Sequence, residues 1–196
     1  AMVKAKEKGM VVMCHSENHE LSSTDMRLSE NTMTWRNITL AKYTGCDTHI
    51  SHVSTKESME YIIEAKKGGF VDAIATDHAP HTEEDKANGA PGISGIETAF
   101  SICYTKLVKS REINLSKLSE IMSKRPAEII KMNKGQIKVG YDGDLILIDL
   151  EREYEINSKS FLSKGKNTPF DGMKVYGKIE KTIKSGKIVY DDAREI

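Results

Sequence analysis

Short apolar runs separated by longer amphipathic stretches make up the first two thirds of the chain. Apolar runs at residues 10–14, 48–53 and 70–76 predict three strands. Between them, residues 35–43 and 56–67 predict helices, the second because its apolar side chains recur near helical spacing. Strands that alternate with helices indicate an α/β domain built on a parallel sheet or barrel.

The pattern changes near residue 134. Before that point three further helices are predicted, at residues 96–109, 116–123 and from Pro126 onward. After it, short strands follow one another with Gly and Asp turns and no helix between them, at residues 135–140, 144–149, 178–183 and 187–190. We therefore assign residues 1–133 to part of an α/β barrel and residues 134–196 to a small all-β region.

Charge and composition narrow the functional classes. The chain has 29 basic and 29 acidic residues and a formal net charge of zero, so no field of one sign attracts a polyanion, and nucleic acid is not expected as a partner. No apolar run approaches the ~20 residues of a membrane helix, so no membrane partner is expected. Three cysteines without a CxxC spacing favour a reducing compartment, and the expected location is the cytoplasm.

Three side chains that can bind metal lie near or just after the ends of the three predicted strands. They are His15, His52 and Asp77. In a parallel barrel the carboxyl ends of the strands meet at one face, so these side chains can converge there. Two neutral imidazoles and one carboxylate suit a hydrolytic zinc site with an open position for water. Asp77 is placed to exchange protons with that water and with a leaving nitrogen.

Ordinary roles remain open for each of these residues. A histidine at a strand end is often a hydrogen-bonded loop residue, and Asp77 alone could cap a helix or form a turn. His49 precedes His52 by three positions, so the two point to opposite faces of an extended strand. His49 is therefore the structural one of the pair, and His78 is expected to be structural as well.

Five segments together resemble the dihydroorotases of the amidohydrolase superfamily. The resemblance covers nearly the whole chain and includes an Asp-His-Ala-Pro-His motif and a Lys-Asn-Thr-Pro-Phe motif. The segments are residues 14–18, 49–55, 77–81, 92–99 and 163–170. Hydantoinases, dihydropyrimidinases and allantoinases share the architecture, and another cyclic-amide hydrolase of this kind is the nearest alternative.

The resemblance implies a fold and a metal centre. The fold would be a (β/α)8 TIM-type barrel, present here in part, with a small β domain. The centre would hold Zn2+, two ions per active site in the complete protein. By motif match, His15 and His52 would bind the second zinc, and Asp77 would bind the first and act as general acid and base.

The resemblance also implies a substrate and its contacts. The enzyme would interconvert N-carbamoyl-L-aspartate and L-dihydroorotate in pyrimidine synthesis. His81 would hold the substrate carboxylate, because a loop histidine can supply a charge-assisted hydrogen bond. The backbone at Pro91 and Gly92 would contact the pyrimidine ring.

The chain also departs from the family pattern. The family's His-x-His pair and bridging carboxylate would lie before Ala1, and segments are expected to be missing near residues 33/34 and 69/70. We expect chain breaks at both places. A different class of function stays open, an inactive scaffold subunit for aspartate transcarbamoylase. Association with that enzyme or a homodimer are the expected assemblies.

Overall fold

The computed structural model describes residues 1–67 and 73–193. The chain forms two compact units, Ala1–Ala73 and Ile74–Ile196. Each unit has its own sheet, one parallel and one antiparallel.

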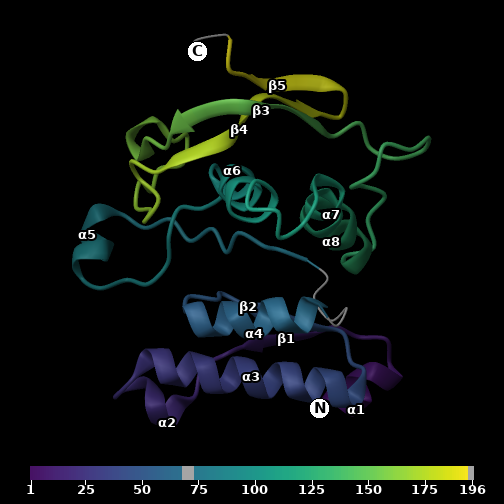
Figure 1. The fold of residues 1–196 in the computed structure, drawn as a ribbon, viewed down its shortest axis with the longest axis vertical. Coiled ribbons are helices and arrows are strands. Elements are labelled where there is room, and N and C mark those ends of the chain that lie inside the picture. The colour runs from purple at the N-terminus through teal and green to yellow at the C-terminus, as the bar shows by residue number, and fades with distance from the viewer. Residues whose placement is uncertain (68–72, 194–196) are drawn as a thin grey trace. The chain divides into compact units, whose positions relative to one another are not determined.

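The first unit is a strand-helix-strand arrangement with flanking helices (Figure 1). Its sheet has two parallel strands, and Cys14 of β1 pairs with Ile50 of β2. Helix α3 connects the strands and packs against β2 and α4. The elements are α1 (Met2–Glu7), β1 (Val12–His15), α2 (His19–Ser22), α3 (Met26–Thr44), β2 (Thr48–Ser51) and α4 (Lys56–Lys67).

Helix α3 is longer than the sequence predicted. The Asp25 side chain accepts from the Leu28 N–H at the start, and Gly45 ends the helix in a left-handed conformation. The predicted start of this helix at residue 35 is therefore wrong, because the helix begins at Met26. The reason lies in the buried face, which carries Ser29, Thr34 and Asn37 in place of a periodic row of apolar side chains.

The second unit places helices against a three-stranded antiparallel sheet of order β3-β4-β5 (Figure 1). Leu118, Ile121 and Val175 are fully buried and belong to its core. The elements are α5 (Glu83–Ala87), α6 (Ala99–Cys103), η1 (Tyr104–Val108), α7 (Leu115–Ser119), η2 (Glu120–Lys124), α8 (Arg125–Ile129), β3 (Leu145–Glu155), η3 (Ser158–Ser160), β4 (Lys174–Lys184) and β5 (Lys187–Asp191).

Polar contacts fix α6 to the sheet. The Ser101 hydroxyl donates to the Gly177 carbonyl at 2.8 Å, and the Tyr154 hydroxyl donates to Ser101 Oγ at 2.7 Å. Gly177 allows this approach, because a Cβ there would lie 3.0 Å from Phe100 and 3.1 Å from Tyr104. The helix predicted from residue 96 is confirmed in part, since it begins at Ala99 and passes into a π-helical turn at Tyr104.

Two predicted strands need correction. Residues 135–140 form no strand; they are irregular, with bends at 135–136 and a turn at 139–140. Residues 73–76 are also not in a strand, and residues 70–72 lie outside the described residues. Ile74 donates its N–H to the Ile121 carbonyl at 2.9 Å, so that backbone group bonds to a helical segment and not to a neighbouring strand.

The predicted boundary between residues 133 and 134 lies inside the second unit and stays a prediction. The expected break near residue 33 is absent, because Met33 and Thr34 lie inside α3. The expected break near residue 69 lies outside the described residues. Within residues 1–67 and 73–193, no helix combines the length and the apolar character needed to cross a bilayer.

Candidate active site

His15 and His52 lie side by side at the carboxyl end of the parallel sheet. His15 is the last residue of β1 and pairs with Ser51, so His52 follows the partner strand directly. His15 Nδ1 lies 2.6 Å from His52 Nε2, and the ring centroids are 4.5 Å apart. Both residues are exposed. The sequence placed both side chains at strand ends, and the structure brings them into contact.

The donor set of this pair fits a zinc ion. Two imidazole nitrogens on one tetrahedral zinc, each at about 2.0–2.1 Å, lie roughly 3.3 Å apart. The nitrogens of His15 and His52 are 2.6 Å apart, so a small separation of two exposed rings would admit an ion. One nitrogen of the pair carries a proton in the hydrogen bond, and both would be unprotonated as ligands.

Glu17 orients the first of these rings. His15 Nε2 lies 2.6 Å from Glu17 Oε2, so the ring bridges Glu17 and His52. This hydrogen bond is the main reason that the pKa of Glu17 lies below its usual value. A carboxylate on the far nitrogen of a histidine fixes the ring's orientation and strengthens it as a ligand.

The backbone at His52 is unusual, with φ of 36°. A left-handed conformation is uncommon outside glycine, and such strained positions cluster at functional sites. The next two residues are held by Glu30 of α3, whose carboxylate accepts from the N–H groups of Ser54 and Thr55, both at 3.0 Å. Glu30 therefore fixes the turn that carries His52.

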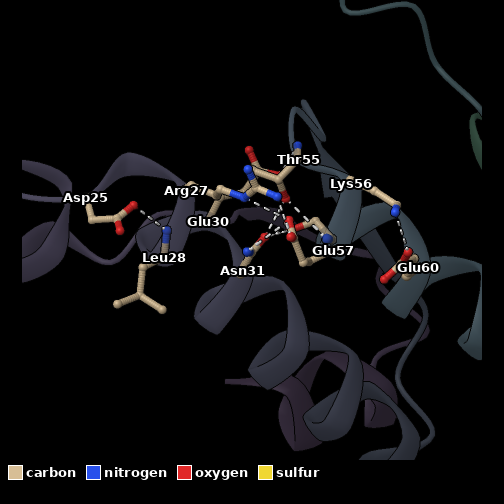
Figure 2. A network of polar contacts seen from close by, with 10 residues as sticks. Asp25, Arg27, Leu28, Glu30, Asn31, Thr55, Lys56, Glu57 and Glu60 are labelled. Atoms are coloured by element: carbon tan, nitrogen blue, oxygen red, sulfur yellow. Dashed lines mark hydrogen bonds and ion pairs between the residues drawn. The ribbon is translucent and has the colours of Figure 1, made fainter.

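A wider network joins the first turns of α3 and α4 (Figure 2). Asn31 Oδ1 accepts from the Thr55 hydroxyl and, at 3.0 Å, from the Ser58 hydroxyl. Arg27 donates to both carboxylate oxygens of Glu57.

Burial raises the pKa of Glu30, but the hydrogen bonds from Ser54 and Thr55 outweigh it and leave a lowered pKa.

Asp77 belongs to the second unit and also has a left-handed backbone, with φ of 45°. Only three other non-glycine residues share a positive φ in the described part of the chain, so two of the three predicted metal ligands fall in this rare class. Asp77 is exposed, and its carboxylate makes no hydrogen bond or ion pair with any residue that the structure describes. No described residue therefore competes with a metal ion for this carboxylate.

His78 has the structural role expected for it. Its Nδ1 accepts from the Gly95 N–H at 3.2 Å, and its Nε2 lies 3.4 Å from the Ser163 hydroxyl. Its backbone forms an isolated parallel bridge with Ile93. His78 thereby ties the segment that carries His81 to the backbone at Ile93 and Gly95 and to the Ser163 side chain.

His81 and Gly92 lie together. A Cβ built on Gly92 would be 3.5 Å from His81 Nε2, 2.7 Å from the Cβ of Ala79 and 3.1 Å from its carbonyl oxygen. Gly92 also has φ of 105°, a conformation open mainly to glycine. The Lys86 ammonium donates to the Ala90 carbonyl at 2.6 Å and to the Gly92 carbonyl at 3.1 Å. The loop around Pro91 is therefore built closely against His81.

The predicted three-residue ligand set stays a prediction. In residues 1–67 and 73–193, no group of three or more His, Cys, Asp or Glu side chains is close enough to hold a metal ion. The structure brings together two pairs, His15 with His52 and His81 with Gly92. Asp77 belongs to the second unit.

Sequence reasoning missed the residues that hold these pairs. Glu30 lies before the helix predicted at residues 35–43, and no motif or spacing marks Lys86. Asn167 lies in a motif that marked the family, but no role followed from its position. Its side chain contacts both His81 and Gly92, at 3.4 Å and 3.0 Å.

Known proteins resemble the chain along nearly its whole length. Residues 1–189 match the Amidohydrolase family. A dihydroorotase from Clostridium botulinum is 44% identical over 97% of this chain and 58% of its own length, and one from Brevibacillus brevis is 34% identical over 98% and 62%. The chain thus spans about three fifths of these relatives. The first alignment has 233 positions against 196 residues here, so that relative carries internal segments without a counterpart.

Solved structures give the same fold. A D-hydantoinase from a Bacillus sp. AR9 superposes on all of this chain and 60% of its own, with a TM-score of 0.78 and 21% identity. A dihydropyrimidinase from Brevibacillus agri superposes with a TM-score of 0.79 and 19% identity. At such identities the likeness concerns the fold alone.

Proposed function

Because the chain belongs to the Amidohydrolase family, we propose that it forms part of a dihydroorotase, which interconverts N-carbamoyl-L-aspartate and L-dihydroorotate in pyrimidine synthesis. The observation that carries this proposal is the 44% identity to a dihydroorotase over 97% of the chain. The proposed fold is part of a (β/α)8 barrel, and the parallel pair β1–β2 with α3 between its strands supports it.

The proposed metal ligands are His15, His52 and Asp77. The contact between the two imidazoles supports the first two. The third is supported by an exposed carboxylate on a left-handed backbone that has no partner among the described residues. Zinc, two ions in the complete site, would polarise the ring amide and lower the pKa of a bound water to about 7. Glu17 would keep the His15 ring oriented toward the ion.

Asp77 is the proposed catalytic residue. Its carboxylate takes a proton when water attacks the ring amide and returns that proton to the leaving nitrogen. Its exposure and its freedom from hydrogen bonds with the described residues leave both oxygens available for this exchange. In the reverse direction the same carboxylate removes the proton from the attacking carbamoyl nitrogen.

His81 and the backbone at Pro91 and Gly92 form the proposed substrate contacts. The closeness of His81 Nε2 to Gly92 supports their action on one ligand. A protonated imidazole beside a substrate carboxylate makes a charge-assisted hydrogen bond. The backbone beside it fits a flat ring, because glycine leaves no side chain in the way.

Another cyclic-amide hydrolase is the second candidate, favoured by the fold of the hydantoinase and dihydropyrimidinase structures. Sequence identity favours the dihydroorotase, since those two proteins are 21% and 19% identical to this chain, against 44% for the Clostridium botulinum dihydroorotase. The proposal also includes either a homodimer or an association with aspartate transcarbamoylase, and a cytoplasmic location.

The test uses the full-length protein that contains this chain. Purified with zinc, it should hydrolyse L-dihydroorotate in preference to hydantoin and allantoin, and metal analysis should find zinc. His52→Ala should lose both zinc and activity, and Asp77→Asn should lose activity. His19→Ala, an exposed histidine of α2, is the matched control and should keep both. Turnover of hydantoin in place of dihydroorotate would favour the second candidate, and zinc binding without turnover of any cyclic amide would indicate a scaffold subunit.

A further inference from the structure

Asn167 joins three separate stretches of the second unit. Its Nδ2 donates to the Gly92 carbonyl at 3.0 Å, and its Oδ1 accepts from the His81 N–H at 3.4 Å. Its own carbonyl accepts from the Ser94 N–H at 2.7 Å. One side-chain amide therefore holds the backbone of both residues proposed to contact the substrate.

The segment that carries Asn167 is itself firmly seated. Ser94, 1% exposed, donates from its hydroxyl to the Gly165 carbonyl at 2.7 Å. A Cβ on Gly165 would lie 2.6 Å from the Cβ of Pro80 and 3.1 Å from the His81 nitrogen, so the backbones touch. No side chain fits between Gly165 and the segment before His81.

A second anchor holds the other end of this segment. The Glu97 carboxylate accepts from the N–H groups of Leu162 and Ser163, at 2.8 and 2.9 Å. Both anchors reach from residues 94–97 to residues 162–165. Asn167 is therefore held on a fixed support, and its amide can transmit that position to His81 and Gly92.

The structure points to Asn167 as a positioning residue, which we propose sets the spacing between His81 and Gly92 and thereby substrate affinity. This inference rests on the proposed role of those two residues. Asn167 does not touch the reacting atoms and acts through the backbone that it holds. Its loss should raise KM and leave kcat nearly unchanged, because binding is weakened equally in the ground state and the transition state.

Two variants distinguish the two hydrogen bonds of the Asn167 side chain. Asn167→Asp keeps the acceptor for the His81 N–H but loses the donor to Gly92 and places two oxygens against each other. Asn167→Ala loses both. The matched control is Asn157→Asp. Toward the described residues the Asn157 side chain only accepts, from the Lys159 N–H at 3.1 Å, and aspartate keeps that contact.

The first measurement needs no substrate. Amide hydrogen exchange of the full-length protein, read by mass spectrometry, should accelerate around Gly92 in Asn167→Asp and around both Gly92 and His81 in Asn167→Ala. Asn157→Asp should leave both regions as in the parent. Unchanged exchange at residues 79–94 in both Asn167 variants would overturn the inference, whatever the protein's substrate.

The second measurement is steady-state kinetics on the zinc-loaded protein. Asn167→Asp should raise KM for L-dihydroorotate about tenfold with kcat within about twofold, the size expected for one lost hydrogen-bonded placement. A large fall in kcat at constant KM would overturn the inference. If the parent hydrolyses another cyclic amide, the proposed function fails, and the same split is then measured on that substrate.

Discussion

Gly92 combines a positive φ with a close neighbour, and both restrict substitution at the proposed substrate contacts. With φ of 105° and the Ala79 Cβ 2.7 Å from any added Cβ, Gly92→Ala should destabilise the fold by about 1–3 kcal/mol and raise KM. The matched control is Gly89→Ala in the same loop, where φ is 85° and no atom lies within 4 Å of the added Cβ.

Urea unfolding and steady-state kinetics measure the two effects. Gly89→Ala carries the backbone strain alone, so it should lose stability but keep its KM. Equal KM values for the two variants would show that the Ala79 contact has no bearing on the loop.

At the residue scale, the sequence predicted the candidate site residues but not the residues that hold them in place. His15 and His52 were predicted because a strand end is a local pattern, and the structure places them in contact. Glu30 and Asn167 act over separations of 24 and 75 residues, to Ser54 and Gly92. No local pattern encodes such contacts, so their roles could only be found in three dimensions.

At the scale of elements, Glu30 couples α3 to the turn before α4. Glu30→Ala removes the acceptor for two backbone N–H groups and should lower the free energy of unfolding by about 1–3 kcal/mol. Glu60→Ala is the control, since Glu60 makes only an exposed pair with Lys56 and should cost less than about 0.5 kcal/mol. Chemical denaturation compares the two, and equal losses would contradict the role of Glu30.

The Arg27–Glu57 ion pair, which joins α3 to α4, makes the stability of the fold depend on pH. The hydrogen bond from Arg27 lowers the pKa of Glu57 from 4.5 to about 2. Because the folded value is the lower one, the stabilisation is complete above pH 4.5 and is lost as the pH falls toward 2.

Urea midpoints between pH 6 and pH 3 test this dependence. The parent should lose more stability over that range than Glu57→Gln, and added salt should reduce the difference, because the pair is at the surface. Parallel curves for the two proteins would rule out a contribution from Glu57.

Regular elements with apolar periodicity were predicted well. Helix α4 spans Lys56–Lys67 as predicted, and Thr55 caps it by accepting from the Ser58 N–H at 3.1 Å. Helix α3 was found only in its second half, because small polar side chains fill its buried face. Residues 135–140 alternate like a strand but are irregular, and Val139 is fully exposed.

At the scale of the whole chain, the second unit depends on a few fully buried side chains. Ile121→Ala should cost about 2–5 kcal/mol, because its side chain is 0% exposed and the cavity would not fill. Ile130→Ala is the matched control, 63% exposed, and should cost much less. Urea denaturation, with the unfolding of residues 74–193 monitored by hydrogen exchange, measures the difference. Similar losses in the free energy of unfolding would show that Ile121 is not a core residue.

The alternation of strands and helices predicted the α/β class, and the family match and solved structures agree with it. The sequence did not predict the compact units, which divide between Ala73 and Ile74. Long-range packing decides that division, as when helix α6 bonds to strand β4 across 76 residues. A pattern of local elements carries no information about such pairings.

The left-handed backbone at His52 and Asp77 has a consequence for laboratory evolution. Glycine adopts this conformation at the least cost, and asparagine tolerates it well. A library of variants selected only for survival of heating should therefore accumulate glycine or asparagine at both positions, which deep sequencing would reveal. Heat resistance would rise while the histidine and the carboxylate disappear, so each round of selection must also score turnover.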